Sequence, residues 1–317
     1  MIDRIRAADR GGHRLSIGLA LAGTTALVSG VSVFLNATAV RSVGDPVLFT
    51  TLKNGVAALI LVALALALVP RPVATVAALG TRTKLGLLAL GVVGGSIPFV
   101  LFFTGLASAS APAAAVIHKT MFAWVALLAV VLLRERLGLL QLGALGVLLV
   151  SQLLIQPPDG ISWTSGETMI AIATGLWAVE VIIAKRVLRG VPSPIGAVAR
   201  MGIGLVLLVA YLTWTGGLAK LGGLGMEQWA WVLGTGLLLS AYVATWYAAL
   251  RRAPATAVTA VLTVAAPITA ALQLVANGQV PATGATIGYA GTLLAGLVVA
   301  VVVLRRPAAA THEPALA

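Results

Sequence analysis

The chain has 317 residues, of which 60% are hydrophobic and 9% are charged, and it contains no cysteine. An ordinary globular domain is about 25% charged, so this composition indicates an integral membrane protein. The absence of cysteine excludes disulfides and cysteine-ligated metal centres. The formal net charge of +12 does not indicate nucleic-acid binding, because the basic residues lie in short segments without interleaved aromatic residues.

Ten apolar runs follow one another along the chain, and each is about 20 residues or longer, enough to span roughly 30 Å of hydrocarbon. Glycine and proline mark the breaks between them. The first run follows an Arg-rich start, as a signal peptide would, but its place in a regular series favours a membrane span. The expected fold class is therefore an all-α integral membrane protein. The runs lie at 15–37, 46–69, 84–107, 111–133, 137–156, 166–188, 194–215, 228–250, 254–276 and 282–304.

The lysine and arginine residues between the runs set the expected orientation, because positive residues are retained on the cytoplasmic side. If the N-terminus is cytoplasmic, only Arg41 and Lys220 fall in outer loops, whereas every other basic residue between the runs falls inside. This bias predicts a multi-pass protein of the cell's inner membrane. Both termini are expected on the cytoplasmic side, which requires an even number of spans.

Two short segments repeat: Ala111–Val116 and Ala253–Val258 agree at five of six positions. They open the fourth and the ninth runs, and an offset of five spans means that the two copies cross the membrane in opposite directions. Such inverted repeats are typical of secondary transporters, although an alanine-rich coincidence is the alternative. The expected organisation is a cytoplasmic segment (1–14), one five-helix repeat (15–156), a second (157–304) and a disordered cytoplasmic tail (305–317).

The end of the fourth run carries a further motif, Leu133-Arg134-Glu135-Arg136-Leu137, followed by Gln141-Leu142-Gly143. With ten spans and an inverted repeat, it resembles the EamA family of the drug/metabolite transporter (DMT) superfamily, in which an "LGE" signature closes the fourth helix of each repeat. Glu135 fills the acidic position and is expected to be a structural signature residue. The second repeat departs from the pattern, because Asn277-Gly278-Gln279 contains no acid.

The resemblance also implies how the spans are arranged. Spans one to four and six to nine would surround a central cavity. Spans five and ten would lie outside it and are candidates for a homodimer contact.

Five ionisable residues fall within the spans, where hydrocarbon does not solvate them, and such residues are functional candidates by default. The set is Lys53, His118, Lys119, Glu180 and Arg200. Lys53 and Lys119 lie roughly 10–12 Å below the outer ends of their spans at 1.5 Å per residue. His118 and Lys119 point about 100° apart on a helix, so one of them is expected to face the cavity and the other a neighbouring helix. Snorkelling toward the interface is the alternative for the lysines.

Glu180 is the only acid deep inside a span, and Trp177, three residues earlier, shares its face. Phe122 likewise follows His118 by four residues. Arg200 and Lys119 are alternative partners for Glu180, and a static Glu180–Arg200 pair is a further alternative to a functional one. Glu180 and His118 are the candidate proton carriers. Gly91, Gly94 and Gly95 indicate close helix packing.

These features predict an inner-membrane secondary transporter of a small metabolite, such as an amino acid or another carboxylate-bearing compound, that exports by alternating access. The alternatives are a channel, a non-transporting scaffold or an intramembrane enzyme. No HExxH or GxSxG motif of such an enzyme occurs in the sequence, so we expect neither catalysis nor a cofactor or bound metal. The expected partners are the substrate and the lipid bilayer.

Overall fold

The computed structural model describes residues 2–106, 108–109, 111–157 and 163–305. Nine helical stretches in this part of the chain are long and apolar enough to cross a membrane, and α8 is a shorter apolar helix of 17 residues. In chain order the elements are α1 (Ile2–Val43), α2 (Pro46–Leu68), α3 (Pro72–Ala77), α4 (Thr81–Ala89), the π-helix η1 (Leu90–Gly94), α5 (Ile97–Leu106), α6 (Ala111–Lys119), α7 (Met121–Leu133), α8 (Leu139–Ile155), α9 (Ser165–Val187), α10 (Ser193–Trp214), the 3₁₀ helix η2 (Gly217–Gly223), α11 (Met226–Leu250), α12 (Ala255–Leu262), α13 (Ala265–Asn277) and α14 (Thr283–Leu304).

The helices correspond to the predicted runs, and the largest difference is at the first. Helix α1 extends from Ile2 to Val43, beyond both ends of the predicted run, and Gly44 ends it by turning the chain with a positive φ of 77°. Of the predicted tail, residues 306–317 lie outside the described residues.

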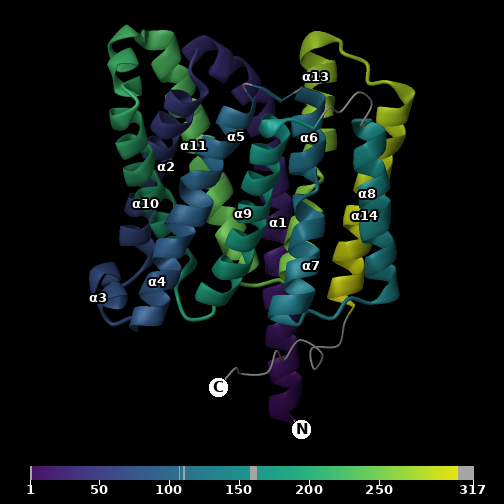
Figure 1. Cartoon of the computed structure of the whole chain (residues 1–317). Helices are drawn as coiled ribbons and strands as arrows, with labels where there is room; N and C mark the ends of the chain where they lie inside the picture. Colours follow the sequence, from purple (N-terminus) through teal and green to yellow (C-terminus); the bar gives the residue numbers. More distant parts are fainter. Residues whose placement is uncertain (1, 107, 110, 158–162, 306–317) are drawn as a thin grey trace.

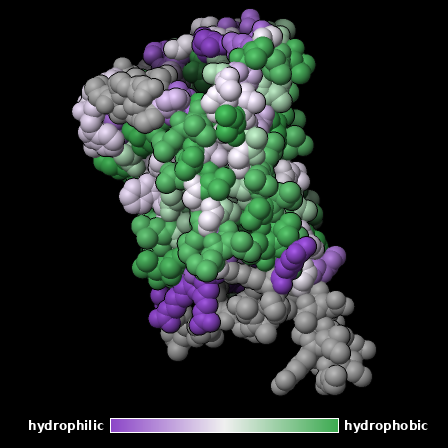
Figure 2. Space-filling view, turned by 90° about the vertical axis from the view of Figure 1, so that its right-hand side faces the viewer, coloured by the Kyte–Doolittle hydropathy of each residue, from purple (hydrophilic) through white to green (hydrophobic). Residues whose placement is uncertain are grey.

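The helices form one bundle in which the N-terminal end of α1 and the C-terminal end of α14 lie at the same end (Figure 1). We call this the basic end. The C-terminal ends of α7, α9 and α11 also lie there, with Arg134 directly after α7, Arg186 in the last turn of α9 and Arg251 directly after α11. Helices α8 and α14 pack side by side at one edge. Figure 2 shows a broad apolar band on one face, with hydrophilic side chains above and below it.

Packing within the bundle pairs each helix of the first half with one of the second. Helix α1 packs along α11, and α5 packs along α9. Helix α2 packs against α10, and α8 packs against α14. The two broken spans also have corresponding neighbours, since α6 and α7 contact α9 whereas α12 and α13 contact α1.

The fourth and the ninth apolar stretches are both interrupted, and the same side chain occurs at both breaks. Thr120 lies between α6 and α7, and its hydroxyl donates to the carbonyl of Ile117 at 2.7 Å. Thr263 lies between α12 and α13, and its hydroxyl donates to the carbonyl of Ala260 at 2.6 Å. Hydroxyls that bond to the backbone compete with the regular helix ladder, so the two breaks share the same local hydrogen bond.

At the end opposite the basic one, the turn between α1 and α2 is tied to the segment between α10 and α11. Asp45 caps α2, because its Oδ1 accepts from the backbone N–H groups of Val47 and Leu48, each at 3.0 Å. Its Oδ2 accepts from Lys220 Nζ at 2.6 Å. Burial alone raises the pKa of the Asp45 carboxyl, but the hydrogen bonds from Leu48 and Lys220 outweigh it and hold the pKa below the ordinary value of 3.8.

We expect Asp45→Asn to lower the free energy of unfolding by at most about 1 kcal/mol at pH 7, because Lys220 is solvent-exposed and asparagine still caps a helix. A depressed carboxyl pKa contributes stability above the unfolded-state value of about 3.9. That contribution is lost as the pH falls through the lower, folded-state pKa, so the difference between wild type and Asp45→Asn should be smaller at pH 3 than at pH 7. Thermal unfolding in detergent at both pH values measures it.

Asp45→Ala is the companion variant, because it removes the cap as well as the charge. It should cost about 1 kcal/mol more than Asp45→Asn, at pH 7 and at pH 3 alike. A loss of unfolding free energy in Asp45→Asn that is as large at pH 3 as at pH 7 would contradict the ion-pair explanation.

Candidate functional site

A cavity of about 250 Å³ lies between the two halves of the bundle. Its walls come from eight helices: α1, α2, α5, α6, α7, α9, α10 and α11. Four of the five ionisable residues predicted within spans line it, together with Trp177; they are Lys53, His118, Glu180 and Arg200. The structure thus gathers residues from distant parts of the sequence around one space.

Glu180, Arg200 and Tyr247 form a buried polar group, of which Glu180 and Arg200 line the cavity. The Tyr247 hydroxyl donates to Glu180 Oε1 at 2.5 Å, and Arg200 Nε lies 3.5 Å from the same oxygen. All three residues are at most 7% exposed. Arg200 Nε has no hydrogen-bond partner among the described residues, so the ion pair balances the charges but leaves a donor of the guanidinium unused.

The π-helix η1 makes room for this group. A Cβ on Gly94 would lie 2.4 Å from Glu180 Cγ and 3.1 Å from Arg200 Nε, and a Cβ on Gly95 would lie 2.1 Å from the Arg200 carbonyl oxygen. Trp177 Nε1 donates to the Gly94 carbonyl at 3.3 Å. Single-turn π-helices are rare and occur frequently at functional sites. Here the glycines let η1 approach the ion pair closely.

Lys53 lies on α2 and is 9% exposed. Its Nζ lies 5.0 Å from the centre of the Phe49 ring, which is a cation–π distance. Within the part of the chain that the structure describes, no carboxylate lies within 4.0 Å of this ammonium group. The ring therefore compensates the buried charge only in part.

His118 is part of an aromatic cluster on the other side of the cavity. Its ring centre lies 5.2 Å from that of Phe102 and 5.1 Å from that of Trp177. Its Nδ1 is buried and has no hydrogen-bond partner among the described residues. Lys119, the next residue, is not among the residues that line this cavity, and of the two neighbours it is therefore His118 that faces it.

Phe122 is also absent from this lining. It is 3% exposed and packs in the main apolar core, where it supports the helices without contacting the cavity.

Four polar lining residues, three on α1 and Tyr242 on α11, were not predicted from the sequence. Ser29, Ser32 and Asn36 lie on α1, and their spacing of three and four residues places them on one face; this polar stripe in an apolar run was a usable signal. Tyr242 and Trp246 lie on α11 and stack with an interplanar angle of 12°. Aromatic residues are common at membrane interfaces, so nothing in their pattern distinguished these two.

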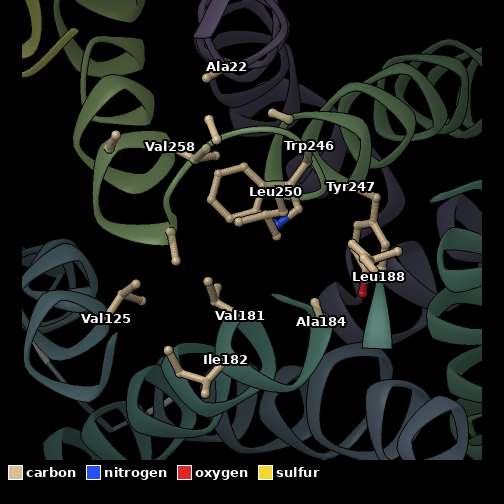
Figure 3. Close-up of a cluster of buried hydrophobic side chains, with 14 of the residues drawn as sticks. Ala22, Val125, Val181, Ile182, Ala184, Leu188, Trp246, Tyr247, Leu250 and Val258 are labelled. Carbon is tan, nitrogen blue, oxygen red and sulfur yellow. The ribbon is translucent and has the colours of Figure 1, made fainter. Parts of the chain in front are cut away.

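The cavity is closed toward the basic end by one continuous apolar core. Figure 3 shows Val125 of α7, Val181 of α9, Leu250 of α11 and Val258 of α12 converging there. Lys185 Nζ donates to the carbonyls of Leu250 and Ala253, which ties α9 to the turn between α11 and α12.

At the opposite end the buried apolar residues of the described chain form two separate clusters. One contains Ala39, Phe49 and Val232, from α1, α2 and α11. The other contains Ala114, Ile117 and Ile170, from α6 and α9. The bundle is therefore joined across its centre at the basic end and divided at the other.

Glu135 lies at the basic end and crosses between the two halves. Its carboxylate accepts from the backbone N–H groups of Ala255 and Thr256, at 2.7 and 3.2 Å, and from the Thr256 hydroxyl at 2.7 Å. It thus caps α12, where the helix dipole favours a negative charge. Arg134 ends α7 with a positive φ of 55°, and Gly278 ends α13 in the same way with a positive φ of 65°.

We expect Glu135→Ala to lower the free energy of unfolding by about 1–2 kcal/mol, because two backbone N–H groups at a partly buried helix start lose their acceptor. Glu135→Gln keeps an acceptor oxygen and should cost less. Thermal unfolding of the two variants in detergent provides the comparison. Equal stability of Glu135→Ala and wild type would contradict a structural role.

Among the described residues, no group of three or more His, Asp or Glu side chains is placed to hold a metal ion. The chemistry that the cavity offers is therefore that of charges, hydrogen bonds and aromatic faces.

Comparisons with known proteins place this geometry in a family. A solved structure titled only "Crystal structure of protein" is similar in fold, with a TM-score of 0.72 and 17% sequence identity over 92% of this chain and 99% of that one. No curated protein sequence matches the chain. A model of the EamA-like transporter family matches residues 16–156 and, a second time, residues 164–302. The protein therefore belongs to the EamA-like transporter family of the DMT superfamily and is a multi-pass membrane protein.

Proposed function

We propose that the protein is a secondary transporter that moves a small metabolite by alternating access between two inverted five-helix halves. The observation that carries this proposal is the cavity, whose charged residues come from both halves and which lies against the one continuous apolar core at the basic end. A site at the interface of two repeats, near mid-depth, is typical of secondary transporters.

Three features support inverted halves of five spans each, with α8 counted as a span. The helix pairings are reciprocal. The first span of one half, α1, packs against the third span of the other, α11, and likewise α9 packs against α5. The fourth and the ninth spans break at Thr120 and Thr263 with the same hydrogen bond. Both of these spans end at a residue with a positive φ, Arg134 and Gly278.

The basic end is the cytoplasmic one in this proposal, because positive residues are retained inside. The protein then lies in the cell's inner membrane with both termini in the cytoplasm. The single apolar core closes the cytoplasmic side, and the divided packing lies outside. In this proposal the cavity faces outward, and release to the outside is the step that export requires.

The cargo in this proposal is a small metabolite with a carboxylate, either an amino acid or another carboxylate-bearing compound, because basic groups outnumber acids around the cavity. Glu180 and His118 are the proposed proton carriers. Helices α8 and α14 are the proposed homodimer contact, since they lie at the edge of the bundle and expose apolar residues such as Leu140 and Leu297.

A flux experiment separates this proposal from a channel or a scaffold. Proteoliposomes are loaded with a defined mixture of amino acids and small carboxylic acids, and efflux and exchange are followed by mass spectrometry with and without a pH gradient. A transporter gives flux that saturates and shows counterflow. Flux that rises linearly without counterflow would indicate a channel, and the absence of any flux a scaffold.

We expect Glu180→Gln to abolish the dependence of flux on the pH gradient, because the amide cannot take up or release a proton. Glu227→Gln is the matched control, since Glu227 accepts from Ser42 and Trp231 at the outer end of α11, away from the cavity. It should leave the pH dependence unchanged. Equal pH dependence in Glu180→Gln and wild type would remove Glu180 from the coupling step.

A further inference from the structure

Three polar side chains with unused hydrogen-bonding capacity lie at one level of the cavity. Asn36, Lys53 and His118 are each seven residues from the outer end of their helices, α1, α2 and α6, which is roughly 10 Å at 1.5 Å per residue. All three line the cavity. Asn36 Oδ1 and His118 Nδ1 are buried without a hydrogen-bond partner among the described residues.

Lys53 carries the charge that the cavity leaves unbalanced. Glu180 and Arg200 compensate each other, with 3.5 Å between Oε1 and Nε, and histidine is mostly neutral at pH 7. The Lys53 ammonium, which is over nine-tenths buried, faces the Phe49 ring and no carboxylate of the described chain. The lining as a whole therefore has one positive charge in excess, and one negative charge would neutralise it.

The remaining walls fit a flat apolar body. Phe99 and Trp177 meet edge to face with ring centres 5.3 Å apart on one side, and Tyr242 and Trp246 are stacked on α11. The volume of about 250 Å³ is about eight times the roughly 30 Å³ that one water molecule occupies in the liquid. This space admits a small ring with a short side chain.

We infer that the cavity binds a singly charged organic anion with a flat, ring-like body, whose carboxylate lies at the level of Lys53 and His118. The inference deepens the proposed transport function and rests on it, because the bound anion is taken to be the cargo. Lys53 is the residue that determines specificity. A bound zwitterion has no net charge, so the cavity keeps its one excess positive charge. A bound dianion changes that excess to one negative charge.

Binding to the purified full-length protein in nanodiscs tests the inference. Quenching of the total tryptophan fluorescence reports it, because two of the seven tryptophans, Trp177 and Trp246, line the cavity. The probes are 3-phenylpropionate, phenylalanine, phenylsuccinate, 3-phenylpropanol and propionate. Compared with 3-phenylpropionate, phenylalanine adds an ammonium group and phenylsuccinate adds a carboxylate. 3-Phenylpropanol lacks the charge, and propionate lacks the ring. We expect 3-phenylpropionate to bind at least about 10-fold more tightly than each of the others, the factor that one charge-assisted hydrogen bond supplies.

Variants of Lys53 assign the effect to one side chain. Lys53→Met should weaken 3-phenylpropionate binding by about 10- to 100-fold and leave 3-phenylpropanol binding unchanged, which also shows that the variant is folded. Lys53→Arg should retain most of the affinity and serves if the methionine variant does not fold. Lys119→Met is the matched control, since Lys119 is an intramembrane lysine outside the lining, and it should bind 3-phenylpropionate as wild type does.

Three results would overturn the inference: phenylalanine bound as tightly as 3-phenylpropionate, an equal loss in Lys119→Met, or no binding of any probe. Its failure is distinguishable from failure of the transport proposal. Saturable exchange of other metabolites without anion preference would refute the inference alone, whereas selective anion binding without saturable flux would refute transport alone.

Discussion

Replacing Arg200 by leucine should lower the free energy of unfolding by about 3–5 kcal/mol, which is the usual cost of leaving one member of a buried ion pair without its partner. Glu180 is 2% exposed and would retain only the Tyr247 hydroxyl. Thermal unfolding in detergent measures the loss. Arg251→Leu is the control, because Arg251 is exposed at the basic end, and it should change stability by less than about 0.5 kcal/mol.

The double variant Glu180→Gln/Arg200→Leu separates a structural from a functional pair. Removing both charges should restore most of the stability, since a buried ion pair can often be replaced by neutral residues at little cost. Transport should remain abolished if Arg200 and Glu180 serve the cargo or the proton. Full transport by the stable double variant would mean that the pair is only structural.

The second large effect is expected at Gly94. Alanine there would place a Cβ 2.4 Å from Glu180 Cγ and 3.1 Å from Arg200 Nε, so the Glu180 side chain would have to leave its hydrogen bond with Tyr247. Overpacking of this kind costs about 1–3 kcal/mol, and transport should fall more steeply than stability because the displaced group is part of the site. Flux and thermal unfolding are measured on the same preparation.

Gly175→Ala and Gly202→Ala are the matched controls, because these glycines lie on the helices that carry Glu180 and Arg200 and no atom lies within 4 Å of the added Cβ. They should leave transport intact and stabilise by about 0.4–1 kcal/mol, since alanine restricts the unfolded chain. If Gly94→Ala behaves like these controls, the close approach of η1 is not required.

The sequence was sufficient to predict the helices, because runs of about 20 apolar residues leave few alternatives in a membrane. It also identified Lys53, Glu180 and Arg200, since a charge inside an apolar run is costly and therefore conspicuous. The same reasoning selected Lys119 together with His118. Which of two adjacent residues faces a cavity depends on the rotation of the helix, and packing of α6 against α9 sets that rotation.

Other parts of the site depend on tertiary structure alone. Tyr247 looks like any aromatic residue near a helix end until α11 is placed beside Glu180. The glycines at 91, 94 and 95 indicated close packing, but not the π-helix or the ion pair that it contacts. Asn36 could have been found from its spacing with Ser29 and Ser32, because three polar residues on one face of an apolar helix are unusual.

The central claim is that the cavity opens to one side of the membrane at a time. The chain contains no cysteine, so Ser32→Cys introduces a single reactive thiol at the cavity wall, and a membrane-impermeant maleimide reports its access from each side. We predict labelling from the outside in the resting protein, and 3-phenylpropionate in counterflow should raise labelling from the cytoplasmic side while lowering it from the outside. Simultaneous labelling from both sides at rates that do not vary reciprocally would contradict alternating access.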